Sequence, residues 1–410
     1  MSALLVRFPA FRSRNFRLFF AGQLISLIGT WMQHIAMVWL AYRLTDSVAM
    51  LGLVGFASQI PILLFGIPAG VLNDRLDRRR LLMATQFLAL LQALLLTTLT
   101  AAGTITPALL VVLAFALGCI NAVDLPARQA FVAQMVSDLR ALPNAIGLNS
   151  FLMNGSRFVG PALAGLIVAQ AGEAACFLIN ALSYLAVLMA LATIRLAPAA
   201  PRTAQPAGQA LRAGLAYAFA QPRIRATLLL IAGFSFCVTP YVVMMPVYAR
   251  DLFHGTAKTY GLLVGAAGFG SLAAALFLAW RGGRHAGAGL DRLVGRAALT
   301  GGTALACFAW TPTIELAFPL LAILGCAVVL AAAGSNTLIQ LEVEENFRGR
   351  VMAIFSTAFL GIAPLGSLTV GLLSEWLDVR PTLSLCGLLA LGAGWLYRRE
   401  LSRLPEPMLR

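Results

Sequence analysis

Arg157 places a charged side chain near the middle of a long apolar stretch, at approximately residues 143–170. On a helix, Ser150, Asn154 and Pro161 lie within an arc of about 60° that includes Arg157. A charge in so apolar a segment is costly unless it is partnered, by about 2.5–3.5 kcal/mol where the segment spans a membrane. No carboxylate is close to Arg157 in the sequence. We therefore expect its partner to be a group on another helix, a backbone carbonyl, or an anionic ligand.

A second polar face runs along the apolar stretch at residues 16–42. Its side chains fall within an arc of about 100° on a helix: Gln23, Ser26, Thr30, Gln33 and His34. Such a face either lines a ligand cavity or forms hydrogen bonds between helices. His34 is either a buried, hydrogen-bonded histidine or a proton carrier. Three isolated polar residues in other apolar stretches are further candidates to line a cavity: Gln59, Tyr241 and Asn336.

The sequence contains no arrangement typical of an enzyme site. Its three histidines (His34, His254 and His285) are far apart. Its six cysteines occur singly in apolar segments, which supports neither a metal site nor a disulfide framework. No phosphate-binding glycine-rich loop is present, so we do not expect ATP to be used. We predict no catalytic residues, no metal and no cofactor.

The composition indicates an integral membrane protein. Hydrophobic residues make up 60% of the 410 residues, charged residues 11%, and the mean hydropathy is +0.85. A soluble domain contains about 45–50% apolar residues. So few charges cannot cover so much apolar surface in water, and this outweighs the prior for two or three soluble domains.

The chain divides into apolar runs of the length that a membrane-spanning helix needs, about 20 residues. Six runs precede a polar, Pro- and Ala-rich stretch at 195–224 and six follow it: 16–42, 50–72, 81–101, 106–125, 143–170, 174–194, 225–249, 258–280, 290–310, 314–338, 351–374 and 381–398. We predict an all-α membrane protein of twelve helices, with one six-helix half at 1–194, a central loop at 195–224 and a second half at 225–410.

The positive charges fix the predicted orientation. Of the 30 Lys and Arg residues, 25 fall on the cytoplasmic side if the N-terminus is cytoplasmic, four fall outside, and Arg157 lies within a span. This bias satisfies the positive-inside rule. The net charge of +14 is therefore a topology signal and not one for nucleic-acid binding. We predict both termini and the central loop to be cytoplasmic, with no cleavable signal at the N-terminus.

The two predicted halves are weakly alike. The segment RFVGPALAG around Pro161 corresponds to GIAPLGS around Pro364. Transporters built from repeated six-helix halves place the substrate site between the halves, near the bilayer midplane.

The segment GVLNDRLDRRR, after the second predicted helix, resembles the GxLaDrxGrrr signature of the major facilitator superfamily. The matching residues are Gly70, Leu72, Asp74, Arg75, Arg78 and Arg79, whereas Asp77 stands where that family usually has glycine. The resemblance implies a cytoplasmic gate. Asp124 and Arg128 are four residues apart and can form a local ion pair. In the resembled family, an acid at this position can join the gate, so Asp124 alternatively contacts Arg78 or Arg79.

The fifth predicted helix resembles the antiporter motif of the same superfamily, G-x8-G-x3-GP-x2-GG. The corresponding residues are Gly147, Ser156, Gly160, Pro161, Ala164 and Gly165, with Ser and Ala replacing two glycines. Small residues let helices approach closely. The stretch from Phe16 to Val54 and LPARQAFVAQMV (Leu125–Val136) are similar to the exporter branch that contains enterobactin exporters and macrolide efflux proteins. This resemblance implies alternating access and proton-coupled export.

We therefore expect a secondary transporter that exports small amphipathic molecules, drug-like or siderophore-like, across the cytoplasmic (inner) membrane by proton antiport. We expect it to act as a monomer in the lipid bilayer. The alternatives are an importer or facilitator of a small polar nutrient, a lipid translocator, and, from another class, a membrane-embedded enzyme or sensor.

Overall fold

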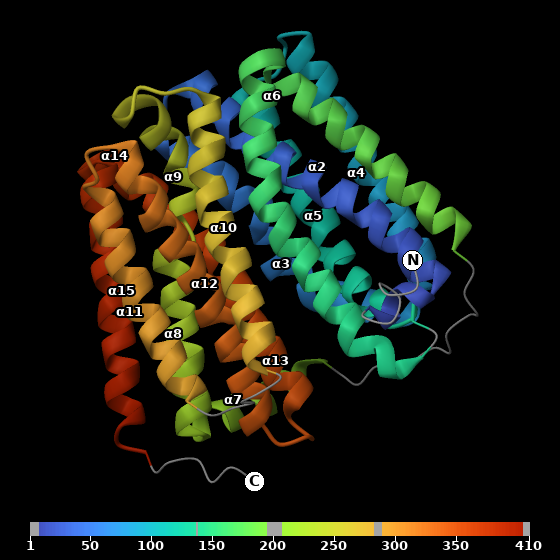
Figure 1. Ribbon diagram of the computed structural model, residues 1–410, viewed down its shortest axis with the longest axis vertical. Helices are drawn as coiled ribbons and strands as arrows, with labels where there is room; N and C mark the ends of the chain where they lie inside the picture. The colour runs from blue at the N-terminus through green and yellow to red at the C-terminus, as the bar shows by residue number, and fades with distance from the viewer. Residues whose placement is uncertain (1–7, 137, 195–206, 283–288, 405–410) are drawn as a thin grey trace. The chain divides into compact units, whose positions relative to one another are not determined.

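The computed structural model describes residues 8–136, 138–194, 207–282 and 289–404, which form helices and turns with no strand among them (Figure 1). The first helices are η1 (Pro9–Arg12), α2 (Arg14–Thr45), α3 (Val48–Arg75), α4 (Arg78–Ala101), α5 (Pro107–Val132), η2 (Leu139–Ala141) and α6 (Leu142–Thr193). After them come α7 (Ala207–Ala220), α8 (Pro222–Val238), α9 (Tyr241–Val247), η3 (Tyr248–Leu252), α10 (Ala257–Gly282), α11 (Leu290–Ala309), α12 (Ile314–Glu342), α13 (Arg348–Ser356), η4 (Thr357–Gly361), α14 (Ala363–Leu377) and α15 (Val379–Leu401).

The predicted all-α membrane fold is confirmed. Within the described residues, ten helical segments are long and apolar enough to cross a membrane. The 52-residue α6 contains two predicted spans, because the chain turns at Gly172, where φ is 76° and ψ is 175°. Helix α11 carries the predicted span 290–310 but is not among the ten, since its first two turns contain Asp291, Arg292 and Arg296.

Two predicted spans are interrupted helices. Pro240 follows α8, and the span continues as α9 and the π-helical segment η3. In the span at 351–374, the π-helical segment η4 separates α13 from α14. Proline removes a backbone donor, and π-helical turns commonly occur as local irregularities inside longer helices. Hydropathy does not detect such breaks, because the side chains on either side stay apolar.

The central stretch 195–224 includes a helix. Helix α7 has an Ala- and Leu-rich sequence, and both residue types favour helix. Its Tyr217 ring stacks on Phe347 with ring centroids 4.2 Å apart, and Ala218 is buried. The first part of the stretch, 195–206, lies outside the described residues.

The chain forms two compact units, and each contains segments of both predicted halves. Unit 1 comprises residues 1–46, 57–204 and 248–265, and unit 2 comprises 47–56, 205–247 and 266–410. Thus η3 and the start of α10 pack with the first half, and the start of α3 packs with the second. The prediction of two six-helix halves remains a prediction.

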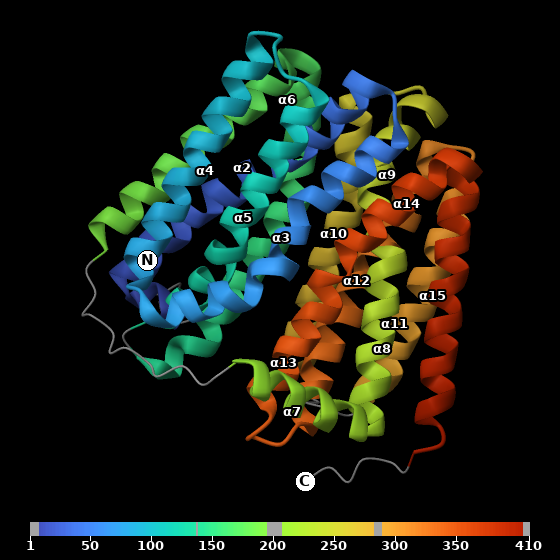
Figure 2. The same cartoon turned by 180° about the vertical axis from the view of Figure 1, so that it is seen from behind.

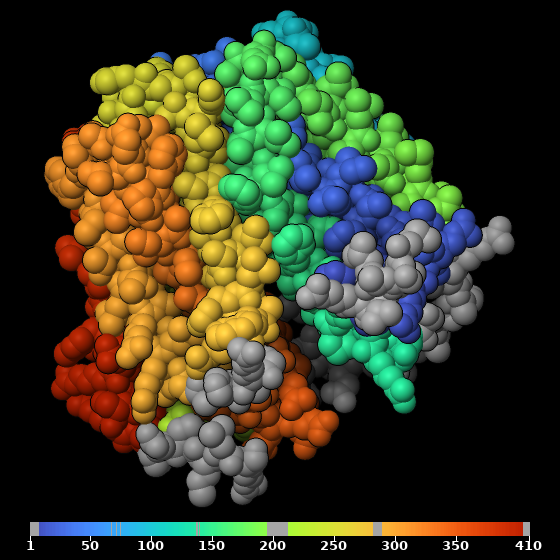
Figure 3. Space-filling model, viewed as in Figure 1, coloured from blue at the N-terminus to red at the C-terminus, as the bar shows by residue number. Residues whose placement is uncertain are grey.

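In unit 1, α2 lies in the angle between the two arms of α6, as Figures 1 and 3 show. Small residues make this approach possible. A Cβ atom on Gly22 would lie 3.2 Å from Ala190 Cβ, and one on Gly29 would lie 2.6 Å from Asn180 Oδ1 and from Ser183 Oγ. Because glycine has no Cβ at these positions, the backbone of α2 packs directly against the second arm of α6.

Both units repeat one packing scheme. In unit 1, α4 packs against α5 and against the second arm of α6 (Figure 2). In unit 2, α11 packs against α12 and α15 in the same way. These are the third helices of the two predicted halves, each contacting the fourth and sixth, which agrees with the sequence similarity between the halves.

Large apolar side chains remain exposed on both units. Four tryptophans near helix ends are more than half exposed: Trp280, Trp310, Trp376 and Trp395. Tryptophan is enriched at membrane–water interfaces, where its ring is apolar and its N–H is polar. Such a surface is suited to lipid.

The close packing of α2 on α6 predicts that Gly29→Val is destabilising. Its Cβ would overlap Asn180 and Ser183, and overpacking costs about 1–3 kcal/mol. Chemical denaturation of the purified protein in detergent would measure this loss. Gly155→Val is the matched control, because a Cβ on Gly155 has no neighbour within 4 Å. An equal loss of stability in both variants would contradict the packing.

Candidate functional site

The first arm of α6 carries its polar residues on the side opposite its exposed apolar residues. At about 100° per residue, the polar and apolar faces are about 180° apart. The polar face consists of Ser150, Asn154, Arg157 and Pro161. The exposed residues of the opposite face are Val159, Leu163 and Leu166. Arg157 is half-buried and points away from the apolar surface.

The helix backbone makes one close contact on each side of this polar face, and each contact is at a glycine. On one side, a Cβ on Gly160 would lie 2.5 Å from Trp31 Cβ of α2. On the other side, a Cβ on Gly165 would lie 2.6 Å from the Ala257 carbonyl oxygen and 3.0 Å from Gly261 Cα of α10. Thus the antiporter-like motif forms the tight contacts of this arm, and the polar face lies between α2 and α10. Gly147, at the start of the motif, has no such neighbour.

Arg157 contacts Trp31, an aromatic residue that nothing in the sequence marks as part of a site. Its guanidinium carbon lies 5.1 Å from the centroid of the Trp31 ring. The His34 ring meets the same indole edge-on, with centroids 5.8 Å apart and planes at 86°. The Asn154 side-chain amide donates to the Ser150 carbonyl oxygen (2.9 Å). The structure therefore brings Arg157 and His34 together around Trp31.

The other polar residues of the predicted α2 face differ in their hydrogen-bond partners: Gln33 binds side chains of other helices, whereas Thr30 binds the backbone of α2 itself. Gln33 is fully buried; its amide donates to Gln92 (2.9 Å), and it accepts a hydrogen bond from Asn180 (2.8 Å). This arrangement corresponds to the interhelical alternative for Gln33. Gln23 is also buried. The half-buried Thr30 donates to the Ser26 carbonyl oxygen one turn earlier (2.8 Å).

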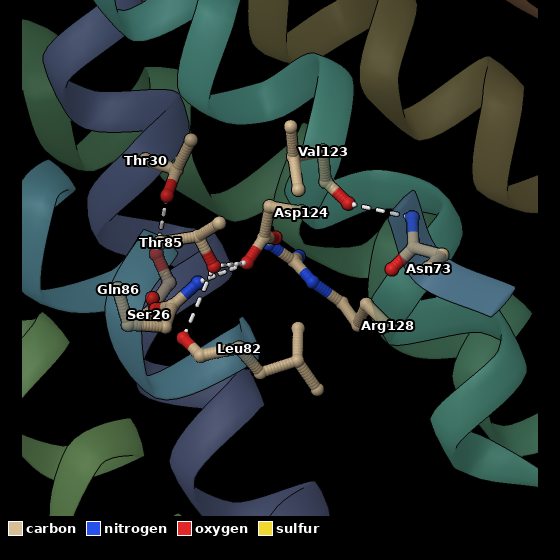
Figure 4. Close-up of polar contacts among 9 residues, drawn as sticks. All are labelled: Ser26, Thr30, Asn73, Leu82, Thr85, Gln86, Val123, Asp124 and Arg128. Atoms are coloured by element: carbon tan, nitrogen blue, oxygen red, sulfur yellow. Dashed lines mark hydrogen bonds and ion pairs between the residues drawn. The ribbon is translucent and has the colours of Figure 1, made fainter. Parts of the chain in front are cut away.

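Asp124 lies at the centre of a buried polar cluster between α5 and α4 (Figure 4). One carboxylate oxygen accepts from Thr85 and from Gln86, both at 2.8 Å. The other oxygen pairs with Arg128, one turn along α5. Of the two alternatives for Asp124, the structure has the local ion pair.

The segment between α3 and α4 is organised by helix capping. Asp77 is the N-cap of α4 and accepts from the Arg80 N–H (2.8 Å), which explains how aspartate replaces the family's usual glycine there. Arg79 donates to the carbonyl oxygens of Leu191 (2.7 Å) and Ala192 (2.8 Å) at the C-terminal end of α6, where a cation is favoured. It does not pair with Asp124.

The remaining predicted gating and cavity residues are placed as follows. Gly70 has open space around it, Arg75 is exposed and Arg78 is half-buried, while the Asp74 side chain lies outside the description. Gln59 is half-buried in α3. Tyr241 and Asn336 belong to unit 2, where Tyr241 is buried and Asn336 is half-buried.

An ionic cluster that was not predicted joins α2 to η3 at the end where α2 turns into α3. We call this end of the helices the α2–α3 end. Arg250 pairs with Asp46 (2.6 Å) and with Asp251 (3.6 Å), and its guanidinium lies 5.1 Å from the Tyr42 ring centroid. The Tyr42 hydroxyl donates to Asp251. The sequence gives only a weak signal for this cluster, because its charged residues lie at or beyond the ends of predicted spans. Charged residues there are also expected in ordinary loops.

A second polar contact at the α2–α3 end lies within unit 2. We call this contact and the pairing of Arg250 with Asp46 the two ties. The Glu375 carboxylate accepts from the Ser47 hydroxyl (2.6 Å) and from the Ala49 N–H (3.1 Å) at the start of α3. One turn further, a Cβ on Gly52 would lie 2.8 Å from Gly371 Cα of α14. Both ties connect the first predicted half to the second.

No group of three His, Cys, Asp or Glu side chains that could hold a metal ion occurs within the described ranges. The apolar helices, the paired packing scheme and an intramembrane charge on a polar helix face together define a helical membrane transporter. The sequence matches the transmembrane secretion effector family over residues 6–407. The chain belongs to this family, within the major facilitator superfamily, and is not an enzyme.

Relatives support this assignment. The staphyloferrin A transporter of Staphylococcus aureus is 27% identical over 377 residues, covering 90% of this chain and 92% of that protein. The multidrug efflux pump Tap of Mycolicibacterium fortuitum is 24% identical, covering 85% and 86% of the two chains. A bacterial homologue of the human lysosomal transporter Spinster shares the fold with a TM-score of 0.73 at 14% identity, covering 96% and 98%.

The buried cluster predicts a large effect of Asp124→Asn. The substitution leaves Arg128 unpaired, and removing one partner of a buried pair costs about 3–5 kcal/mol. We expect a correspondingly lower free energy of unfolding in detergent. Thr85→Val, which loses one hydrogen bond to the same carboxylate, should cost only about 1 kcal/mol. Adding Arg128→Gln to Asp124→Asn should recover part of the loss. Wild-type stability of Asp124→Asn would contradict this role.

Proposed function

We propose that this protein is a secondary active exporter of small amphipathic molecules, driven by proton antiport through alternating access. The observation that carries the proposal is the position of the α6 polar face, between α2 of the first half and α10 of the second. Substrate sites in transporters with repeated halves lie between the halves. Relatives named as the staphyloferrin A transporter and a multidrug efflux pump support a small-molecule substrate, and the second name favours export.

The proposed orientation has both termini in the cytoplasm of the cell, with the protein in the cytoplasmic membrane. It rests on the distribution of Lys and Arg, with 25 residues on the proposed cytoplasmic side and four on the other. The α2–α3 end is then extracellular, and the signature around Asp74 and the Asp124 cluster are near the cytoplasmic ends of their helices. We propose that the protein acts as a monomer.

Alternating access requires the α2–α3 end to open. For this, Arg250 must leave Asp46 and the Tyr42 ring, the Tyr42 hydroxyl must leave Asp251, and Glu375 must leave Ser47. The side chains of Arg250 and Asp46 are 40% and 69% exposed, so their pairing is weak, about 0–1 kcal/mol. Ties of this strength can hold one end closed without preventing a transport cycle. For proton coupling, we propose His34 as the carrier, because its ring lies against Trp31, which also contacts Arg157.

The transport proposal predicts gradient-dependent efflux. Cells that make the protein should accumulate less of at least one compound in a panel of antibiotics and siderophores than cells without it. Collapsing the proton gradient with an uncoupler should abolish the difference. Cells making Gly261→Leu at equal abundance are the inactive control, because a Cβ there would lie 2.4 Å from the Pro161 carbonyl oxygen. Gradient-dependent accumulation above the background would instead identify an importer.

The two ties predict a measurable shift in conformation. Because the exposed pair of Arg250 with Asp46 is weak, Arg250→Gln alone should change the balance of conformations by less than about fivefold, and Arg250→Gln with Glu375→Gln should change it more. Spin labels at residues 45 and 256, both at the α2–α3 end of unit 1, would report the change as a larger population of long distances. Arg140→Gln, at an exposed site outside the ties, is the control. Identical distance distributions in all variants would show that the ties do not control opening.

A further inference from the structure

The Arg157 guanidinium has no anionic partner within the described part of unit 1. Six carboxylates there have described side chains, and each is engaged elsewhere. Asp124 pairs with Arg128, Glu173 with Arg43, and both Asp46 and Asp251 with Arg250, while Asp77 and Asp138 accept from the backbone N–H groups of Arg80 and Arg140. Hence the positive charge on the polar face of α6 has no carboxylate among these groups to balance it.

Trp31 attracts the guanidinium but accepts no conventional hydrogen bond from it, because the only polar group of an indole is an N–H donor. A cation over an indole face is attracted by the ring's π electrons, and the contact at 5.1 Å is of this kind. The five N–H donors of arginine lie in the plane of the guanidinium, in a fork that matches the two oxygens of a carboxylate. Because Trp31 offers no hydrogen-bond acceptor, this contact leaves the N–H donors of the fork for a ligand.

The position of Trp31 is itself fixed. Its Cβ is in contact with Gly160, one turn from Arg157 on α6, and the His34 ring lies against the indole. Arg157, Trp31 and His34 are all half-buried. A fixed cation beside two aromatic rings suits a ligand that has an oxyanion at one end and an apolar body.

We propose that Arg157, with its guanidinium over the Trp31 ring, is a carboxylate-binding site, and that the transported molecules include amphipathic solutes that carry a carboxylate. The inference rests on the proposed transport function and specifies its substrate class. The ligand supplies the negative charge that the described part of unit 1 does not. A lysine at this position keeps the charge but loses the planar fork, so the two cations are not equivalent here.

A test compares carboxylic acids with their uncharged methyl esters. The probes are 1-naphthylacetate, 4-phenylbutyrate and decanoate, each paired with its methyl ester, and binding to the purified full-length protein in lipid nanodiscs is measured by calorimetry at neutral pH. We expect the wild-type protein to bind at least one acid about tenfold or more tightly than its ester. Arg157→Lys should reduce this preference, and Arg157→Gln should abolish it. Arg140→Lys, the same exchange at an exposed site, should keep it.

Melting temperatures of the same samples separate binding from folding. If Arg157→Gln is unstable, Arg157→Lys with its retained charge still tests the fork. If no acid binds wild-type protein better than its ester, or if Arg157→Gln keeps the preference, the site is not a carboxylate site. Gradient-dependent efflux in cells together with equal binding of acids and esters would refute this inference and leave the transport function standing. An acid preference without efflux would keep the carboxylate-binding site but refute the transport function, and with it the substrate class proposed here.

Discussion

The contact between α2 and the first arm of α6 is the constraint on which the candidate site depends. It requires glycine at 160, because a Cβ there would lie 2.5 Å from Trp31 Cβ. With the two backbones this close, the indole reaches the guanidinium of Arg157, three residues earlier on α6. The same arm then meets α10 at Gly165. The arm is therefore held on two sides, and its polar face can lie only between them.

Most of the fold was predictable from apolar run lengths, because a membrane imposes a minimum length on each spanning helix. The irregularities were not predictable in this way. Gly172 joins two predicted spans into one continuous helical element with a sharp turn, while the break at Pro240 and the π-helical segment η4 interrupt two others. Hydropathy measures how apolar a segment is, whereas these features depend on backbone conformation. Helix α7 was missed because a Pro-rich composition at 195–206 dominated the interpretation of the whole central stretch.

The candidate site was predictable in part, for a similar reason. Arg157 could be selected because a charge within an apolar span needs an explanation. Trp31 could not, because an aromatic residue in a membrane helix has no such signature, and its contact is with a residue distant in sequence. Gln33 and His34 are both polar residues on the same predicted face of one apolar stretch. In the structure, Gln33 binds Gln92 and Asn180, whereas His34 lies against Trp31. Only the neighbouring helices distinguish a structural polar group from one beside the site.

The strengths of two ionic contacts, Asp124 with Arg128 and Arg250 with Asp46, fit the movements that the proposed cycle requires. Asp124 is 1% exposed, and its carboxylate is satisfied by three partners within the first predicted half. Separating such a buried pair costs several kcal/mol, so this cluster is suited to a part of the structure that moves as one body. The pair between Arg250 and Asp46 joins different halves and is solvent-exposed, where a pair contributes about 0–1 kcal/mol. Of these two pairs, the buried one lies within a predicted half and the exposed one between the predicted halves. A transporter that must open at the α2–α3 end without losing the structure of either half needs this distribution of contact strengths.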